Sequence, residues 1–246
     1  MISRTRRESQ PTKWAFVLFH FVGQRLHTGF TTEVTESTES KIEVQKKRAE
    51  TQNNLKDLML AILNYEAATH YFPTRAQFDA NGKPLLSWRV LILPYLGEGE
   101  AKLYSEFRLN EPWDSEHNRK LIARMPKVFK HPRIDKPGMT NYLAVVGEEC
   151  MFDVEDKPVQ MKHVMDGTSH TIALVEADSD RAVEWTKPED WEFDPNNPMS
   201  RVAASRPGGF LVASADGSVR FIDESTDPQA IKAMMTRDGG EQVMRP

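Results

Sequence analysis

The sequence predicts an α+β domain in which a long amino-terminal helix packs on an antiparallel β-sheet built from hairpins. Apolar residues recur at helical spacing in the segment 55–63. From Thr140 onward, short strand-like runs dominate, and Asp-Gly pairs stand between them. Helices that precede antiparallel hairpins along a chain are typical of the α+β class. Additional short helices are expected beside the sheet.

The chain is expected to divide at about residue 39. Residues 1–13 are basic, and the apolar run that follows, residues 14–23, is shorter than the roughly 20 residues of a membrane helix. No small-x-small cleavage site follows this run, and the next polar segment, rich in Thr, Ser and Glu, is typical of an exposed linker. We therefore expect residues 1–39 to be a poorly ordered segment with a degenerate signal or anchor and no stable membrane span. Residues 40–246 are expected to form the folded domain.

The long helix is predicted to begin at Ser40, because Ser40 and Glu43 have the spacing of a capping box. Pro73 is expected to stop it. Its mostly polar first half predicts that only the second half packs on the domain. The apolar stripe of that second half consists of Leu55, Leu58, Met59, Ile62 and Leu63.

Shorter elements follow from local signals. Ser87 is a candidate cap for a helix that contains Trp88, and Asp227 with Pro228 predicts the start of a last helix. The remaining predicted elements are a helix near residues 116–125 and strands at residues 140–147, 159–165, 169–176, 209–214 and 218–223.

Two Asp-Gly pairs, Asp166-Gly167 and Asp216-Gly217, form a weak internal repeat. Each lies between two apolar runs, where a tight hairpin turn needs positive φ at its central residues, and Asp-Gly adopts that conformation readily. In the alternative reading, an aspartate acts as a base or a metal ligand. No HxxxH or HExxH spacing accompanies either pair, so the sequence favours turns.

Charge and cysteine content exclude some classes. The net charge is -4, from 36 acidic and 32 basic residues, so the chain lacks the basic field that drives binding to nucleic acid. A single cysteine, Cys150, excludes an intramolecular disulfide. The neighbouring Glu148 and Glu149 are expected to raise the pKa of Cys150 and to oppose thiolate formation. No catalytic residue and no cofactor is predicted, and a GxSxG serine elbow is missing as well.

Two places are candidates for a weak metal site. His163 and His170 flank the Asp166-Gly167 pair and would face each other across a hairpin, with Asp166 as a third ligand. Asp79 and Asn81 begin a run like the start of an EF-hand loop, but Val90 stands where the twelfth-position glutamate belongs. Exposed strand histidines and an ordinary turn explain the same residues without a metal.

Four tryptophans define the other candidate surface. Trp88, Trp113, Trp185 and Trp191 would support binding of a small molecule or glycan if several of them line a concave site. The alternative is that they belong to the core. Burial discriminates between the two, because a ligand surface needs two or more exposed indoles.

Several ordered blocks together resemble the bacterial domain-of-unknown-function family 1559. They are VQKKRAETQNNLKDLMLAILNYEAATHYFP, DANGKPLLSWRVLILPYL, LNEPWDSEHN, TNYLAVVG, DGTSHTIALVE, EWTKPEDW and ADGSVRFI, and the resemblance covers about Ile42 to Val243. That family is similar to type IV pilins and pseudopilins, and it carries a carboxyl-terminal motif of His, nine residues and Asp-Gly associated with prepilin-type processing. The resemblance implies a pilin-like fold and a role in an assembly of the cell envelope or cell surface. The family has no established enzymatic activity, and it has also been grouped with extracellular solute-binding proteins.

The chain departs from the family pattern in three places. Gly29 and Phe30 match the family's processing site, but Glu33 falls one position early and a polar segment follows where the family has its membrane helix. Nine residues separate Arg206 from Asp216, so Arg206 stands where the family has His. The sequence KHPR replaces the usual Cys-Pro after the third helix. Processing, anchoring and pilus packing are therefore open questions for this chain.

Two function hypotheses follow. The first is a non-enzymatic, pilin-like structural or interaction protein of the cell envelope with protein partners. The alternative is a surface module that binds a solute or a glycan. The resemblance implies an envelope or extracellular location, whereas a non-functional amino-terminal signal implies a cytoplasmic one.

Overall fold

The structure, a computed structural model, describes residues 15–202 and 206–240, with side chains from residue 40 onward. Of the segment expected to be a degenerate signal or anchor, residues 1–39, the first 14 residues lie outside the described residues. The chain divides into two compact units, residues 1–48 and residues 49–246. The α+β class predicted from the sequence is confirmed.

Helix α1 (Ala15–Thr69) begins well before the predicted start at Ser40. A capping box needs a non-helical backbone at the capping residue, but Ser40 lies inside the continuous helix, so the prediction of a start there was wrong. The helix ends ahead of Pro73 as predicted. His70 follows with a φ of 65°, and its N–H donates to the Glu66 carbonyl oxygen at 2.6 Å, as in helix ends closed by a left-handed residue. Among the described residues, no helix is both long enough and apolar enough to cross a membrane.

The main sheet has six strands and runs in the order β10-β9-β6-β4-β5, with β8 also paired to β4. Its strands are β4 (Tyr142–Gly147), β5 (Phe152–Asp153), β6 (Ile172–Glu176), β8 (Trp191–Glu192), β9 (Gly209–Ser214) and β10 (Val219–Asp223). The four strands from β10 to β4 are antiparallel, as predicted. The two short strands β5 and β8 instead pair with β4 in parallel.

The smaller elements surround this sheet. Two small antiparallel pairs are β1 (Ala76–Phe78) with β2 (Pro84–Ser87) and β3 (Met139–Thr140) with β7 (Val183–Glu184). The α-helices are α2 (Trp88–Leu91), α3 (Glu98–Glu106) and α4 (Pro228–Met235), and the 3-10 helices are η1 (Leu93–Tyr95), η2 (Asn118–Arg124), η3 (Lys127–Phe129), η4 (Met161–His163) and η5 (Ser179–Arg181).

Both predicted helix caps are present. Ser87 Oγ accepts from the Arg89 N–H at 3.3 Å, and Asp227 Oδ1 accepts from the Gln229 N–H at 3.1 Å. The helix expected near residues 116–125 is the 3-10 helix η2, and the strand expected at residues 159–165 is wrong, because that segment contains η4. Helix α3 was not predicted.

Two hydrophobic clusters lie on the two faces of the sheet. Alternation along β4 sends Tyr142, Ala144 and Val146 to one cluster and Leu143 and Val145 to the other. The first cluster also contains the α1 residues Leu55, Leu58, Met59 and Ile62, and the second contains the α4 residues Ile231, Met234 and Met235.

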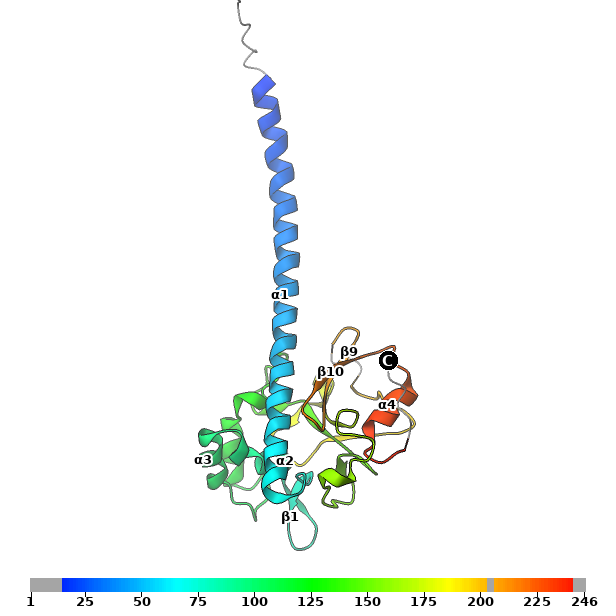
Figure 1. Cartoon of the computed structure of the whole chain (residues 1–246). Helices are drawn as coiled ribbons and strands as arrows, with labels where there is room; N and C mark the ends of the chain where they lie inside the picture. The colour runs from blue at the N-terminus through cyan, green and yellow to red at the C-terminus, as the bar shows by residue number, and fades with distance from the viewer. Residues whose placement is uncertain (1–14, 203–205, 241–246) are drawn as a thin grey trace, which may run out of the picture. The chain divides into compact units, whose positions relative to one another are not determined.

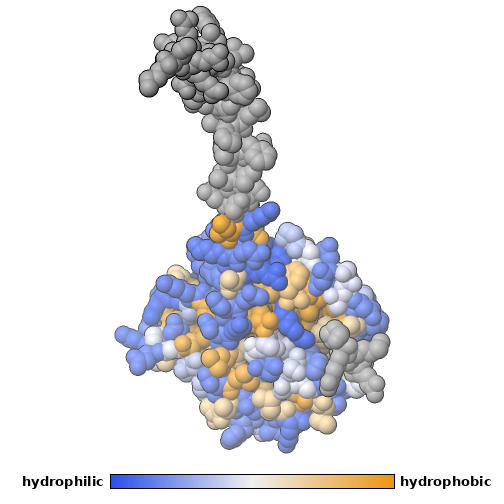
Figure 2. Space-filling model, turned by 45° about the horizontal axis from the view of Figure 1, so that its top comes forward, coloured by the Kyte–Doolittle hydropathy of each residue, from blue (hydrophilic) through white to orange (hydrophobic). Residues whose placement is uncertain are grey.

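Within residues 49–240, the carboxyl-terminal part of α1 lies between α3 on one side and the β9–β10 hairpin on the other in the view of Figure 1. On the face shown in Figure 2, hydrophobic residues form small patches among hydrophilic ones. This surface pattern is ordinary for a water-exposed domain.

Candidate functional site

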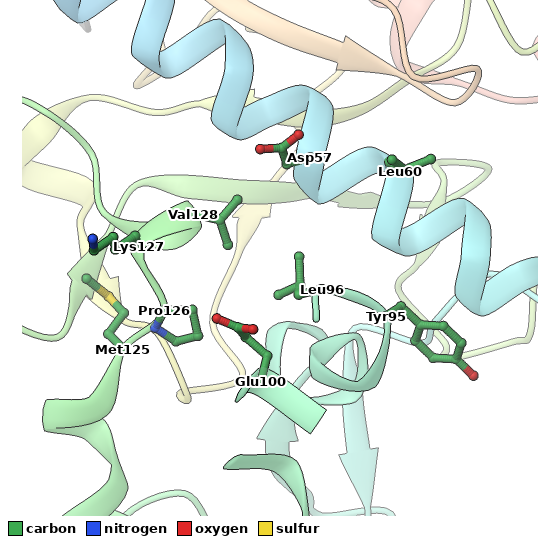
Figure 3. Close-up of a pocket in the computed structure, with 9 residues that line it drawn as sticks. All are labelled: Asp57, Leu60, Tyr95, Leu96, Glu100, Met125, Pro126, Lys127 and Val128. Carbon is green, nitrogen blue, oxygen red and sulfur yellow. The ribbon is translucent and has the colours of Figure 1, made fainter. Parts of the chain in front are cut away.

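A groove of about 570 Å³ runs beside the carboxyl-terminal half of α1. Figure 3 shows Asp57 and Leu60 on α1, with Leu96 and Glu100 below them and Val128 beside Asp57. Leu60 is 56% exposed although it is a large apolar residue in the domain. The rest of the lining consists of Tyr95, Met125, Pro126 and Lys127.

Tyrosine side chains pack beside the groove. Tyr95 contacts Tyr65 edge to face, with ring centroids 5.6 Å apart, and burial raises the pKa of Tyr65 and of the nearby Tyr104 above the usual value for a phenol. These phenols are therefore neutral at physiological pH. An exposed Leu60 between apolar walls, with acidic Asp57 and Glu100 at the rim, is a surface on which an apolar side chain of another protein could pack.

A second arrangement, fully buried, joins α1 to the sheet. Arg206 donates from Nε to Glu176 Oε2 at 2.8 Å and from Nη2 to Glu176 Oε1. His131 Nε2 lies 2.7 Å from Glu176 Oε1. Arg206 Nη2 also donates to Thr51 Oγ1 of α1 at 3.3 Å. The side chains of Glu176 and His131 are 0% exposed and that of Arg206 is 4% exposed.

Hydrogen bonding assigns the His131 tautomer. The Arg133 N–H donates to His131 Nδ1 at 3.2 Å, so that nitrogen carries no proton, and Nε2–H is left to donate to Glu176. Burial opposes the charge on Glu176, but hydrogen bonds from His131 and Arg206, together with the Arg206 charge, outweigh it and lower the pKa of Glu176 to about 2. The cluster is thus a buried Arg206–Glu176 ion pair to which His131 is hydrogen-bonded.

The cluster explains the departure at Arg206. Arg206, noted in the sequence because it stands where the family motif has His, lies beside the start of β9 and pairs with the last residue of β6. Sequence reasoning did not single out Glu176, Thr51 or His131. The available signals were a glutamate at the end of a wholly apolar run and a histidine inside KHPR, and neither identifies its partner.

A second buried ion pair lies under the sheet edge. Arg89, 0% exposed, donates to Asp190 Oδ1 at 2.6 Å and to the Tyr142 carbonyl oxygen at 3.1 Å. Trp88 Nε1 donates to the same Asp190 oxygen at 3.0 Å, and the Ala144 N–H does so at 2.8 Å. Neither Arg89 nor Asp190 was predicted as a notable residue.

The Asp216-Gly217 pair forms the hairpin turn between β9 and β10, as predicted. Gly217 has a φ of 87° and its N–H donates to the Ser214 carbonyl oxygen at 2.9 Å, while Asp216 Oδ1 accepts from the Ser218 N–H at 2.8 Å. Only Gly217 of the pair has positive φ. The connection therefore corresponds to a β-turn followed by a left-handed glycine, rather than to a two-residue turn with both residues left-handed.

The Asp166-Gly167 pair is a turn but not a hairpin turn. It connects η4 to β6, since the expected strand before it does not form. Asp166 accepts backbone hydrogen bonds from Gly239 at 2.8 Å and Gly240 at 3.2 Å, which hold the segment after α4. Its side chain is therefore committed to structure.

The candidate metal ligands do not come together. His163 Nδ1 accepts from the Gln160 N–H at 3.2 Å, and His170 Nδ1 lies 3.1 Å from Ser169 Oγ. Asp79 Oδ1 accepts from the N–H groups of Asn81 and Lys83, so it closes its own turn. In the described part of the chain, no group of three His, Cys, Asp or Glu side chains has the arrangement of a metal site.

The tryptophans do not form an exposed surface. Trp88 and Trp185 are 0% exposed and Trp191 is 2% exposed, because each indole fills the core and its Nε1 donates to a protein acceptor. Trp113 is partly exposed and lies near the Lys187 ammonium, which is 5.9 Å from its ring. The expectation of a tryptophan-lined ligand surface is therefore not met for three of its four members.

Cys150 is buried, and burial is the main cause that raises its pKa to about 12. Of the two acidic neighbours named in the sequence analysis, Glu149 also raises the pKa of Cys150, but it contributes less than burial. The candidate processing residues Gly29, Phe30 and Glu33 lie within α1, and their side chains are outside the described part of the structure.

The comparison with known families bears on the first half of the domain. Residues 47–142 match a family described as a protein of unknown function, DUF1559. This stretch is similar to the DUF1559 family, and it makes up less than half of the chain. No curated protein and no solved structure matches the chain.

The DUF1559 match confirms the family resemblance, over a shorter range than the sequence blocks suggested. It contains Thr51, Arg89 and His131, whereas their partners Glu176, Asp190 and Arg206 lie beyond it. The Arg89–Asp190 ion pair, and the hydrogen bonds of Thr51 to Arg206 and of His131 to Glu176, therefore join the DUF1559 stretch to the later strands and loops of the same domain.

Proposed function

We propose that the protein is a non-enzymatic, pilin-like structural or interaction protein of the cell envelope, and that α1 packs against the same helix of further copies. The observation that carries this proposal is the exposure of α1 between residues 40 and 50. No side chain in that stretch is buried, and Ile42 and Val44 are 62% and 48% exposed. Burial of exposed apolar side chains such as Ile42 and Val44 is favourable, so a partner that covers this stretch would stabilise the helix.

The remainder of α1 is well suited to hold such a contact. From Thr51 onward, its inner face is fixed in the core by apolar residues and by the Arg206 hydrogen bond. On its outer face, Asp57 and Leu60 line the groove shown in Figure 3. A helix fixed on one side and exposed on the other is a rigid support for association, and the match to DUF1559, a family described as of unknown function, is compatible with a role without catalysis.

Site-specific cross-linking tests the proposal. Cys150 is buried with a raised thiol pKa, so a cysteine introduced in the full chain would be the reactive one. We expect Ile42→Cys and Val44→Cys to give disulfide-linked dimers on mild oxidation. Glu224→Cys, also at an exposed position, serves as the matched control and should stay monomeric. A full-length chain that sediments as a monomer and gives no cross-link at either helix position contradicts the proposal.

The alternative of a surface glycan-binding module loses its original support, because three of the four tryptophans are buried. A small-molecule site has to rest on other residues.

A further inference from the structure

A cavity of about 430 Å³ lies at the side of β8, away from the groove beside α1. Arg181, Asp190, Trp191, Asp194, Ser200 and Arg201 belong to its lining. This volume falls within the range of roughly 300–1,000 Å³ of small-molecule sites. Its walls are mostly charged, which favours a polar ligand.

The cavity wall contains an acceptor without a donor. The Asp190 side chain is 3% exposed, and its Oδ1 accepts from Trp88 Nε1, Arg89 Nη2 and the Ala144 N–H. Its other oxygen, Oδ2, is buried and has no partner among the described residues. Buried polar atoms are nearly always paired, so an orphaned carboxylate oxygen calls for an explanation.

The same cavity wall contains a donor without an acceptor. Arg181 Nε is buried and has no hydrogen-bond partner among the described residues. Arg201 also lines the cavity, is exposed, and adds a second guanidinium. A guanidinium donates only, and it matches a carboxylate well.

Backbone contacts hold this cavity in place. The Arg201 carbonyl oxygen accepts from the Asp178 N–H at 3.0 Å, and the Ser200 carbonyl oxygen accepts from Trp191 Nε1 at 2.8 Å. The loop that carries Ser200 and Arg201 is thus tied both to β8 and to the segment before η5. Asp190 is fixed by its three donors on the other wall.

We propose that this cavity binds a small zwitterion of the free α-amino acid class, with its ammonium group on Asp190 Oδ2 and its carboxylate on Arg181 and Arg201. Asp190 Oδ2 needs a hydrogen-bond donor and Arg181 Nε needs an acceptor. The ammonium and carboxylate groups of a zwitterion supply both. Both atoms are buried in this structure, so the ligand reaches them only when the side chains that cover them move aside. The site is independent of α1 and goes beyond the proposed association of copies.

Matched probes test the two ends of the ligand separately. The full-length chain is titrated by calorimetry and by NMR with L-alanine, acetate, methylamine and glycine betaine. Acetate lacks the ammonium group, methylamine lacks the carboxylate, and the quaternary nitrogen of betaine has no N–H to donate. We expect alanine to bind at least about tenfold more tightly than each of the other three, the ratio that one lost charged hydrogen bond produces.

Variants test the residues. Arg181→Met and Arg201→Met are expected to weaken alanine binding by about tenfold or more, whereas Arg119→Met, at an exposed position outside the cavity, should leave it unchanged. Asp190 is not replaced, because its loss would leave the buried Arg89 without its ion-pair partner. The acetate and betaine titrations instead test the contact between Asp190 and the ligand ammonium group.

Three outcomes would overturn the inference. They are no alanine binding at millimolar concentration, equal binding of acetate, and alanine binding that survives both arginine substitutions. Because α1 is unaltered in every variant, these outcomes do not bear on the cross-linking result.

Discussion

Arg206 and Glu176 form a bidentate ion pair inside the domain, with Arg206 Nε 2.8 Å from Glu176 Oε2 and Arg206 Nη2 bonded to Oε1. The same Nη2 reaches Thr51 of α1 at 3.3 Å. The pair therefore connects the last residue of β6, the segment before β9 and the long helix.

Removal of Arg206 should strongly destabilise the domain. Arg206→Met leaves Glu176 as a buried carboxylate without its cation, and such losses typically cost about 3–5 kcal/mol. Urea melts followed by circular dichroism measure the change. Arg124→Met, which breaks the exposed pair with Glu106, is the matched control and should shift the melt very little. Equal small shifts in both variants would show that the buried pair contributes no more than a surface pair.

Acid should unfold the protein partly through Glu176. Its folded pKa of about 2 lies below the usual value for glutamate, so the unfolded chain binds the proton more readily than the folded one. The stabilisation is therefore complete above about pH 5 and is lost as the pH falls toward 2, with a total of about 3 kcal/mol. Free energies of unfolding from urea melts across this range should show that slope for the wild-type chain. The slope should be shallower in Glu176→Gln, and an identical slope in both would contradict the assignment.

The Cys150 thiol should be unreactive in the folded protein. Burial raises its pKa to about 12 and covers the sulfur, so thiolate is scarce at pH 8. A chromogenic disulfide reagent should react slowly with the native chain and rapidly once guanidinium chloride unfolds it. Prompt stoichiometric labelling of the native chain would show that this cysteine is accessible.

Gly217→Val should be more damaging than Asp216→Asn. A valine at a φ of 87° is strained, and we expect a loss of roughly 1–3 kcal/mol. A Cβ at this position would lie 3.7 Å from Leu63 Cδ1, so steric contact with α1 is not the main cause. Asparagine keeps the oxygen that accepts from Ser218 and should change stability by under about 0.5 kcal/mol. Urea melts of both variants decide between a turn and a chemical role, and the reverse order would favour the chemical role.

The sequence correctly predicted those helices and strands that depend on short-range features such as a turn glycine or a helix cap. The β9–β10 hairpin depends on one glycine, and α4 depends on the Asp227 cap, so both were found. The segment before Asp166 was predicted wrongly as a strand, because its conformation depends on backbone hydrogen bonds to a residue far away in the sequence. The N–H groups of Met165 and Asp166 donate to the Arg237 carbonyl oxygen after α4 instead of to a neighbouring strand.

The candidate sites were harder to predict for a similar reason. Arg206 could be noted from a family motif. Its partner Glu176, however, lies thirty positions earlier in the sequence, at the end of β6. Asp190 Oδ2 and Arg181 Nε are notable only because they have no hydrogen-bond partner among the described residues. The absence of a partner cannot be predicted from the sequence. The tryptophans illustrate the opposite error, since an indole is equally suited to a core and to a ligand surface.

The edges of the main sheet limit how copies of the chain can meet. One edge ends in the two-residue strands β5 and β8, and the other is β10, which carries the charged Arg220 and Asp223. Short or charged edge strands offer few unpaired backbone groups to an incoming strand. Intermolecular β-sheet extension, the usual route to fibrous aggregates, is therefore disfavoured at both ends of this sheet.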